Sequence, residues 1–372
     1  MMVEAGKTVL ARGRVKIEGE AEVLGSRRKE FESDRFVPVY CISDCNVTAD
    51  EFEVVDGCTI PESWKRLAEK DWEVLFIYGG VDRGKSTLAT YLANRVGGAW
   101  VLDLDVGQAD VAHPGAMGYG YAKDIVSLSE VGMENGYFVG TISPSFRESK
   151  CLRGVARLWN ELEKLEGRKI VDTTGWIRGR RAKDYKLAKL EIIQPDVVAS
   201  FEGNPEFLRD WKVFEVESGH VVKRSREERA SIRAALYARW MRDGKKLEVR
   251  DPLGGKELPK EFLQEVLGVE VEFARRGDDF LFVCLSRRSE VDPGIIRGLR
   301  ELYEVDEVCV VGREEMRGIL VGLYKGRKYL GFGLLSFEGK WVLETPFEDF
   351  DSMELGEIRF DGEKEYIVRL PV

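Results

Sequence analysis

The sequence VLFIYGGVDRGKST occupies residues 74–87 and carries the most informative pattern of the chain. Five apolar or aromatic residues precede G-x-x-x-x-G-K-[ST], and residues 86–96 have the apolar spacing of a helix. A buried strand, a glycine-rich loop and a helix in this order form a phosphate-binding loop, or P-loop. The chain is therefore predicted to be an α/β protein that binds a nucleoside triphosphate.

Each residue type in this loop has a chemical role. Glycines let backbone N–H groups surround phosphate oxygens, and the helix N-terminus adds the positive end of its dipole. Lys85 is expected to reach the β- and γ-phosphates, and the Ser86 hydroxyl to bind Mg²⁺ or another divalent cation. The nucleotide is expected to be ATP or GTP, and no purine-selecting motif distinguishes between the two. The predicted nucleotide-binding residues are Gly79, Gly80, Val81, Asp82, Arg83, Gly84, Lys85, Ser86 and Thr87.

Working outward from the loop, the chain divides into three predicted parts. Residues 59–244 alternate strands with helices, as in βαβ units with a parallel sheet. The strands are predicted at 74–78, 99–102, 170–171, 197–201 and 213–216, and the helices at 86–96, 147–166, 183–193 and 225–241. Residues 1–58 read as short strands, one of them over 46–55, and residues 245–372 favour strands with a helix near 293–303. The expected fold is a central P-loop domain flanked by an N-terminal β-domain and a C-terminal, mostly β domain.

The composition narrows the class of protein. A chain of 372 residues is too long to fold around one small core. Its 33% of charged residues predicts a strongly ionic surface. Only three Gln and five Asn occur, a profile that favours a thermophilic source. No apolar stretch is long enough for a membrane span or a secretory signal, so a cytoplasmic location is expected. The six cysteines lack zinc-site spacing and are expected to be small buried side chains.

Three aspartates follow predicted strands and are candidates for metal binding and acid–base chemistry. Asp103 and Asp105 alternate at the end of one strand and are expected to share a face, although either could instead cap the next segment. Asp172 ends another strand in Asp-Thr-x-Gly, a form that holds Mg²⁺ or stabilises a turn. We expect Ser86, Asp103 and Asp172 to bind the metal. Asp103 is the first choice for the catalytic base and Asp105 the second.

Two basic segments favour binding of a polyanionic substrate. The net charge of −9 argues against a protein that coats duplex nucleic acid, because such a protein needs a broad basic face. The first follows Trp176 and contains one acid against six bases, which are Arg178, Arg180, Arg181, Lys183, Lys186 and Lys189. A base could stack on Trp176 while these cations hold phosphates; alternatively, they form a solvated helix face. The second runs from Lys223 to Lys246 and places Arg229 and Arg233 one helical turn apart. This pair could close over the triphosphate, or pair with nearby acids.

Several P-loop classes are excluded by missing motifs. A regulatory GTPase reads guanine with Asn-Lys-x-Asp, but none of the five asparagines is followed by lysine. Transport ATPases carry Ser-Gly-Gly-Gln, and none of the three glutamines lies in that sequence. A kinase-like protein or a nucleotide-binding scaffold remains.

Together these motifs resemble the polynucleotide 5′-hydroxyl kinase family that includes the RNA kinase subunit of eukaryotic pre-mRNA cleavage factor and its archaeal homologues. The resemblance covers most of the chain. It rests on Gly79–Ser86, on Asp103-x-Asp105-x-Gly107-Gln108 followed by Pro114-Gly115, on Gly140-Thr141-Ile142-Ser143-Pro144, on Thr173-x-Gly175-Trp176 and on Arg229-x-x-x-Arg233. Two departures are Asp172, where Asn is frequent in the family, and Gly80, where Pro is frequent.

The resemblance implies a kinase that transfers the γ-phosphoryl group of ATP or GTP to the 5′-hydroxyl of RNA, or of DNA. It implies catalytic roles for Asp103, Asp105, Lys85, Arg229 and Arg233, the last two as a lid. Substrate-binding residues would be Gln108, Thr141, Ser143, Pro144, Trp176 and Arg178, with Thr141–Pro144 as a clasp near the 5′ end. Expected partners are single-stranded or end-exposed RNA and proteins of RNA processing, and no membrane. A non-catalytic ATP-binding scaffold and a simple ATPase are the alternatives.

Overall fold

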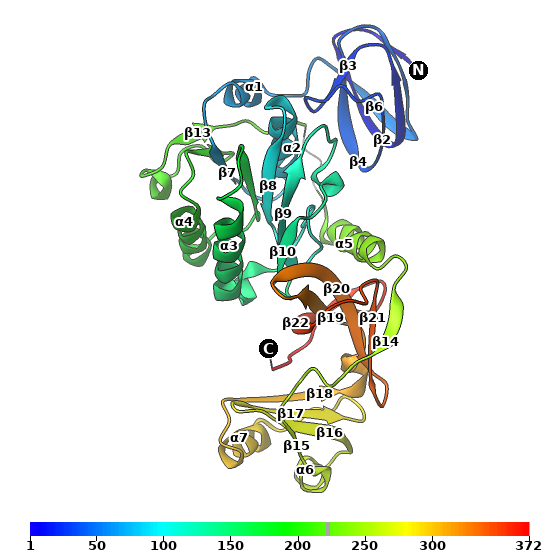
Figure 1. The fold of residues 1–372 in the computed structure, drawn as a ribbon, viewed down its shortest axis with the longest axis vertical. Coiled ribbons are helices and arrows are strands. Elements are labelled where there is room, and N and C mark those ends of the chain that lie inside the picture. The colour runs from blue at the N-terminus through cyan, green and yellow to red at the C-terminus, as the bar shows by residue number, and fades with distance from the viewer. Residues whose placement is uncertain (221–223, 372) are drawn as a thin grey trace. The chain divides into compact units, whose positions relative to one another are not determined.

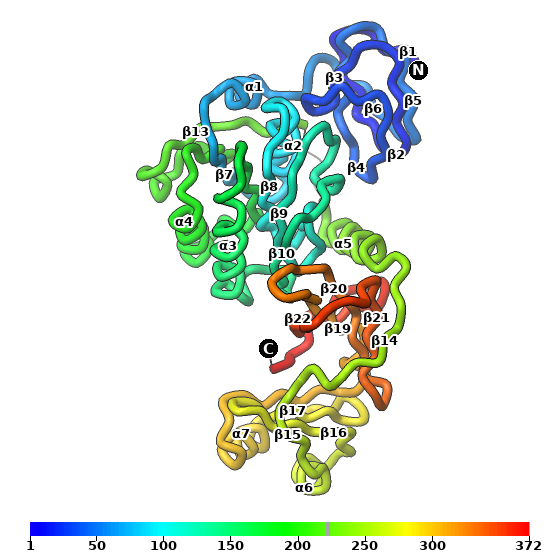
Figure 2. The backbone as a smooth tube through the Cα atoms, viewed as in Figure 1, coloured from blue at the N-terminus to red at the C-terminus, as the bar shows by residue number. Residues whose placement is uncertain are grey.

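The computed structural model describes residues 1–220 and 224–371, which form two compact units (Figures 1 and 2). The first unit consists of Met1–Tyr137 and Ser143–Ser225, and the second of Phe138–Ile142 and Arg226–Val372. The short segment Phe138–Ile142 thus belongs with the C-terminal part of the chain. The predicted domain boundaries after residues 58 and 244 stay predictions.

The first unit begins with a small antiparallel sheet of strand order β1-β5-β2-β4-β3, in which β6 also pairs with β2. Its strands are β1 (Met2–Val3), β2 (Lys7–Glu18), β3 (Ala21–Val23), β4 (Glu30–Cys41), β5 (Cys45–Thr48) and β6 (Glu51–Asp56). The single strand predicted over 46–55 is therefore wrong, because the chain turns at Ala49-Asp50. Buried residues of this sheet, such as Val9 and Val39, share one core with Leu75 and Leu88 of the P-loop region.

A seven-stranded sheet of order β10-β9-β8-β11-β7-β12-β13 forms the centre of the first unit. Its strands are β7 (Val74–Tyr78), β8 (Ala99–Leu104), β9 (Ala116–Ala122), β10 (Asn135–Phe138), β11 (Lys169–Thr173), β12 (Val197–Ser200) and β13 (Val213–Glu215). Strands β8, β11, β7, β12 and β13 run parallel, which confirms the predicted α/β P-loop fold. The helices are α1 (Glu62–Ala68), α2 (Lys85–Arg95), α3 (Glu148–Leu162) and α4 (Arg180–Ile193).

The sheet is mixed, however, because β9 pairs antiparallel with β8. Neither β9 nor β10 was expected from the sequence. The reason is their composition: β9 reads AMGYGYA, and its glycines and alanines have low β-propensity. Gly120 is required there, since a Cβ would lie 2.2 Å from the carbonyl oxygen of Gly132.

The second unit contains α5 (Arg226–Trp240) and two sheets. One sheet has the order β14-β21-β20-β19-β22-β23, and the other β15-β16-β17-β18. The first sheet consists of β14 (Lys245–Glu248), β19 (Ile319–Lys325), β20 (Lys328–Phe337), β21 (Trp341–Thr345), β22 (Ser352–Phe360) and β23 (Glu365–Ile367). The second consists of β15 (Lys256–Glu257), β16 (Val271–Arg276), β17 (Phe280–Leu285) and β18 (Glu307–Gly312). The C-terminal part is thus mostly β, as expected.

Two helices cover one face of the four-stranded sheet in the second unit (Figure 1). They are α6 (Lys260–Leu267), which was not predicted, and α7 (Pro293–Leu302), which was. Asp292 caps α7, because its Oδ1 accepts a hydrogen bond of 2.6 Å from the Gly294 N–H and Pro293 occupies the first turn. The opposite face of the sheet packs against the six-stranded sheet through Phe282, Cys309 and Val311.

The segment Phe138–Ile142 is fixed by residues from the C-terminal part of the second unit. The Phe138 N–H donates to the Tyr324 hydroxyl at 2.9 Å, and the Glu357 N–H donates to the Gly140 carbonyl at 2.9 Å. A Cβ on Gly322 would lie 2.4 Å from the Phe138 ring, so this glycine allows the close approach.

The cysteines were expected to be buried, and five of them are. Cys58 is exposed, so the expectation is wrong at this position, which follows β6 and precedes α1. All six thiols are free. Within residues 1–220 and 224–371, no helix combines the length and apolar character that a bilayer crossing requires.

Candidate active site

The P-loop lies between β7 and α2, as predicted. Gly84 adopts the left-handed conformation at φ 91° and precedes α2 without a side-chain cap, so the first amides of the helix are available to an anion. Lys85 Nζ donates a hydrogen bond of 2.7 Å to the Gly80 carbonyl. To bind a phosphate, Lys85 has to exchange this carbonyl for a phosphate oxygen.

A glutamate after β12 also contacts the loop. Glu202 Oε1 accepts a hydrogen bond of 3.0 Å from the Gly80 N–H and forms an ion pair of 3.0 Å with Arg83 Nε. The carboxylate therefore occupies a backbone donor of the kind that binds phosphate in P-loops. This contact was not predicted from the sequence, because residue 202 lies far from the loop along the chain.

Two of the three predicted metal ligands, Ser86 and Asp172, are in direct contact. Ser86 Oγ donates a hydrogen bond of 2.6 Å to Asp172 Oδ2, and Asp172 is 2% exposed. Burial raises the pKa of Asp172 to about 6, while Lys85 and the Ser86 hydroxyl oppose this shift. A hydroxyl and a carboxylate beside the P-loop supply the hard oxygen donors that fit Mg²⁺.

Asp103 lies beside Asp172, since the two residues are paired in register on β8 and β11. Its Oδ1 accepts from the Asp105 N–H at 3.0 Å, and its Oδ2 accepts from the amides of Asp110 and Val111 at 2.6 and 3.1 Å. Burial and the charges of Asp172 and Asp110 raise its pKa well above the usual range. Asp103 is 1% exposed, so its carboxylate fixes the loop after β8 and presents little surface to a ligand.

Asp105 does not share a strand face with Asp103, contrary to the prediction, because β8 ends at Leu104. Asp105 starts the following loop and is half-buried. Its Oδ1 accepts from the amides of Gly107 and Gln108 at 2.9 and 3.2 Å. Among the described residues no hydrogen bond reaches its second oxygen. Of the two carboxylates, Asp105 is the one with an oxygen available to substrate.

Two lysines of the first basic segment are buried, so the alternative of a solvated helix face is wrong for these two positions. Lys186 and Lys189 of α4 are each 0% exposed. Lys186 Nζ donates to Thr173 Oγ1 at 2.9 Å and to the Thr174 carbonyl at 2.5 Å. Lys186 therefore ties α4 to the chain immediately after β11.

Lys189 has a different environment. Its Nζ lies 4.3 Å from the centre of the Tyr185 ring and has no hydrogen-bond partner among the described residues. Burial lowers its pKa to about 8, and the charges of Cys151, Asp105, Asp103 and Asp172 oppose this shift. The periodicity of α4 could have revealed both lysines, because they repeat at helical spacing with Ala182, Tyr185, Leu190 and Ile193, which are also buried.

A residue of the N-terminal sheet also reaches the site and was missed from sequence. Arg35 of β4 forms a bidentate pair with Asp110, with Nη2–Oδ1 at 2.6 Å and Nη1–Oδ2 at 3.0 Å. Asp110 lies in the loop that Asp103 fixes. Arg224 is close by, because its backbone N–H donates to Asp82 Oδ2 at 3.2 Å and burial and Arg35 together lower its pKa. Lys223, the first cation of the second basic segment, lies outside the described residues.

Three of the predicted substrate-binding residues lie in the first unit near these loops. Trp176 is half-buried, with its ring centroid 5.7 Å from that of Tyr185, and Arg178 is exposed. Gly175 packs directly on the P-loop, since a Cβ there would lie 2.7 Å from the Val81 nitrogen. The side-chain Nε2 of Gln108 is buried and has no hydrogen-bond partner in the part of the chain that the structure describes.

The predicted clasp is divided between the two units. Thr141 belongs to the second unit and is 5% exposed, while Ser143 and Pro144 belong to the first. Pro144 starts a short 3₁₀ helix, and the hydroxyls of Ser143 and Ser145 are 2.8 Å apart.

The predicted lid arginines lie on α5 in the second unit. Arg233 is paired with Glu365 of β23: its Nη2 lies 2.7 Å from Oε2, and its Nε donates to both carboxylate oxygens at 2.8 Å. Arg229 is half-buried one turn earlier. For Arg233 to bind a phosphate, its ion pair with Glu365 has to open.

Comparison with known proteins agrees with the resemblance. Residues 79–242 match the family model for the P-loop of mRNA cleavage and polyadenylation factor CLP1. A polyribonucleotide 5′-hydroxyl-kinase of Thermococcus kodakarensis is 29% identical, with 77% of this chain and 86% of that protein covered. The kinase of the same name from Methanocaldococcus jannaschii is 27% identical, with 84% of this chain and 91% of that protein covered.

A chain in the solved structure of a wild-type Clp1p–Pcf11p complex has the same fold. Its TM-score is 0.64 at 13% identity, and the alignment covers 96% of this chain and 97% of that chain. This match shows the fold, while the family model and the two archaeal kinases confirm the predicted resemblance.

Proposed function

We propose that this chain, a relative of the polyribonucleotide 5′-hydroxyl kinases, transfers the γ-phosphoryl group of ATP or GTP to the 5′-hydroxyl of an RNA end. The observation that carries the proposal is the group of side chains at the carboxyl ends of β7, β8 and β11. There the P-loop lysine, a Ser86–Asp172 pair 2.6 Å apart and Asp105, a carboxylate with an oxygen that no described residue hydrogen-bonds, come together at the ends of neighbouring strands. This is the donor set that phosphoryl transfer requires.

The metal part of the proposal rests on Ser86 and Asp172. These two residues would hold Mg²⁺, with Asp103 behind them on the neighbouring strand. When bound, the ion neutralises charge on the β- and γ-phosphates. Asp103 itself acts mainly through position, because its oxygens already accept three backbone hydrogen bonds.

The catalytic base is assigned to Asp105. In the reaction the 5′-hydroxyl oxygen bonds to the γ-phosphorus, the bond from this phosphorus to the β,γ-bridging oxygen breaks, and the hydroxyl proton passes to the carboxylate. A base must lie within hydrogen-bond reach of the hydroxyl. Asp105 can do this with its second oxygen, whereas Asp103 would first have to release backbone amides that hold its loop.

Other residues bind and orient the substrates. Lys85 and the lid arginines Arg229 and Arg233 oppose charge on the transferring group, once Arg233 leaves Glu365. Trp176 stacks on the terminal base and Arg178 binds a phosphate. Gln108, Thr141, Ser143 and Pro144 complete the binding of the 5′ end. None of the described residues is assigned to the 2′-hydroxyl, so a DNA end is part of the same proposal.

The proposal includes a cytoplasmic location, which the six free thiols support. It also includes protein partners in RNA processing. Pcf11p is a partner in the Clp1p structure with the same fold. A purely non-catalytic scaffold is not favoured, because the chain retains Lys85, Ser86, Asp105 and Asp172 in one site.

The test is transfer of labelled phosphate. The protein is incubated with Mg²⁺, γ-labelled ATP and an RNA oligonucleotide carrying either a 5′-hydroxyl or a 5′-phosphate, and matched DNA oligonucleotides are included. We expect label only on the 5′-hydroxyl oligonucleotide, and none with Lys85→Ala. Tight ATP binding without any transfer would refute the kinase, and hydrolysis that is indifferent to 5′-hydroxyl ends would indicate a simple ATPase.

A further inference from the structure

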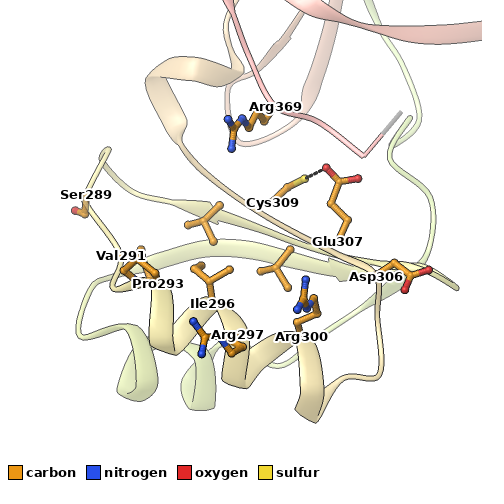
Figure 3. Close-up of a pocket in the computed structure, with 12 residues that line it drawn as sticks. Ser289, Val291, Pro293, Ile296, Arg297, Arg300, Asp306, Glu307, Cys309 and Arg369 are labelled. Atoms are coloured by element: carbon orange, nitrogen blue, oxygen red, sulfur yellow. Dashed lines mark hydrogen bonds between the residues drawn. The ribbon is translucent and has the colours of Figure 1, made fainter. Parts of the chain in front are cut away.

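A groove in the second unit lies beside β18, far along the chain from the P-loop motifs (Figure 3). Its volume is about 540 Å³. The walls come from β18, from α7 and from Arg369 near the C-terminus. None of these residues has a part in the proposed phosphoryl transfer.

One wall of the groove is the edge of a sheet. In the order β15-β16-β17-β18, the last strand pairs with β17 alone, and no other described strand pairs with it. An edge strand presents a row of backbone N–H and C=O groups that can pair with a further strand. Natural proteins usually protect such edges, so an open groove beside one is a candidate binding site for an extended chain.

The floor of the groove is aliphatic. Val308 and Val310 alternate along β18 on the face toward α7, and Ile296 of α7 and Val291 adjoin them. No aromatic residue is among the groove's lining residues. The groove therefore offers small apolar subsites for alternate side chains of a strand, and no ring on which a nucleic-acid base could stack.

Three arginines border this floor, and Figure 3 shows Arg369 on one side of the groove and Arg297 and Arg300 of α7 on the other. Arg297 and Arg300 are three residues apart, which places them on one helix face. All three are exposed, and none forms a hydrogen bond or ion pair within the described residues. This is notable in a chain of net charge −9, where acids are in excess.

We propose that this groove binds an extended, acidic peptide segment of a partner protein. The segment adds a strand to the free edge of β18, places apolar side chains on Val308 and Val310, and directs its carboxylates at Arg297, Arg300 and Arg369. Backbone pairing supplies affinity and the arginines select acidic over basic sequences.

The acids of the groove refine the expected sequence of the ligand. Asp306 and Glu307 lie where β18 begins, and Glu307 Oε1 accepts a hydrogen bond of 3.4 Å from Cys309 Sγ. A carboxylate of the peptide would be repelled at that end. The acidic residues of the bound segment should therefore lie away from the start of β18.

The test uses the full-length protein and three fluorescein-labelled nonapeptides in anisotropy titrations. The first alternates Glu and Val, the second alternates Lys and Val, and the third is the Glu-Val peptide with alternate backbone amides N-methylated. We expect the Glu-Val peptide to bind at least tenfold more tightly than either of the others. Hydrogen exchange of residues 307–312 should slow when it is bound.

The matched variants are Arg297→Glu with Arg300→Glu, and as control Arg209→Glu with Arg317→Glu, two exposed arginines outside the groove with the same change of net charge. The groove variant should lose at least tenfold in affinity, and the control less than threefold. RNA kinase activity should be unchanged in the groove variant, so the result is independent of the proposed function.

Equal binding of the Glu-Val peptide to both double variants would overturn the proposal. So would equal binding of the N-methylated peptide, which would exclude strand addition. If a single-stranded RNA oligonucleotide competes with the peptide in an Arg297- and Arg300-dependent manner and is the tighter ligand, the groove is an RNA site instead.

Discussion

Replacing the buried Lys189 by methionine is predicted to stabilise the protein. The lysine is 0% exposed, its Nζ has no hydrogen-bond partner among the described residues, and its pKa is about 8 instead of 10.5. Because a pKa difference of one corresponds to about 1.4 kcal/mol, the difference of about 2.5 corresponds to about 3 kcal/mol of unfolding free energy. This is the free energy that the folded state loses at pH 7 by holding the ammonium group in the core.

The sign follows from proton linkage. The folded-state pKa is depressed, so the unfolded chain binds more protons than the folded protein between pH 8 and pH 10.5. The cost is fully present below about pH 8, falls as pH rises, and is absent above about pH 10.5. Lys189→Met should therefore be about 3 kcal/mol more stable than the wild type at pH 7 and equally stable at pH 11.

The measurement is guanidinium unfolding of both proteins at the two pH values, with Lys183→Met as the control. Lys183 is exposed on the same helix, so its replacement should give no pH-dependent difference. Phosphoryl transfer should fall in Lys189→Met, because a cation that stabilises the charges of Asp105, Asp103 and Asp172 is removed. The reasoning is refuted if Lys189→Met is no more stable than the wild type at pH 7, or if its gain is the same at pH 11.

Three further predictions concern the proposed roles and the acid stability of the site. Asp105→Asn should lower single-turnover phosphoryl transfer by about 10²–10⁴-fold and leave nucleotide affinity unchanged. Asp103→Asn should chiefly lower the unfolding free energy, so the same pattern in both variants would contradict the assignment of the base. Arg233→Ala should reduce turnover by about 10³-fold or more, while Glu365→Gln, which breaks the same ion pair, should change it less than threefold; equal losses would mean that the pair is only structural. Burial lowers the pKa of His113 from 6.5 to about 3, so the unfolded chain binds a proton at pH 5 that the folded protein does not, and the wild type loses about 2 kcal/mol of unfolding free energy between pH 8 and pH 5. His113→Gln should remove this loss, which urea unfolding at both pH values measures. Unchanged pH dependence in the variant would count against the prediction.

The sequence predicted the P-loop region accurately because its signals are local. The apolar run Val74–Tyr78 coincides with β7, and α2 starts at Lys85, one residue before the predicted start. Glycine and a following helix identify such a loop without knowledge of tertiary contacts. The pairing of Ser86 with Asp172 was also anticipated, since both follow parallel strands whose ends meet at one edge of the sheet.

Other features depend on tertiary context that a single sequence does not carry. The roles of Asp103 and Asp105 differ because β8 ends between them, and the position of a strand end is set by the loop that Asp103 itself fixes. The ion pair of Arg35 with Asp110 joins residues 75 positions apart. Lys186 and Lys189 were assigned by charge alone, although their helical spacing with Tyr185 and Leu190 places them on the buried face.

The assignment of Phe138–Ile142 to the second unit has a consequence for the order of events during synthesis. This segment includes Thr141, and its anchors are Tyr324 and Glu357, which are synthesised about 200 residues later. Until then, the proposed clasp, which begins at Thr141, lacks the hydrogen bonds that fix its segment, even though the P-loop and the carboxylates near it have already been synthesised. A nascent chain that stops before Tyr324 would therefore be expected to bind nucleotide without the proposed clasp, so that the proposed action on RNA ends would require the later part of the chain.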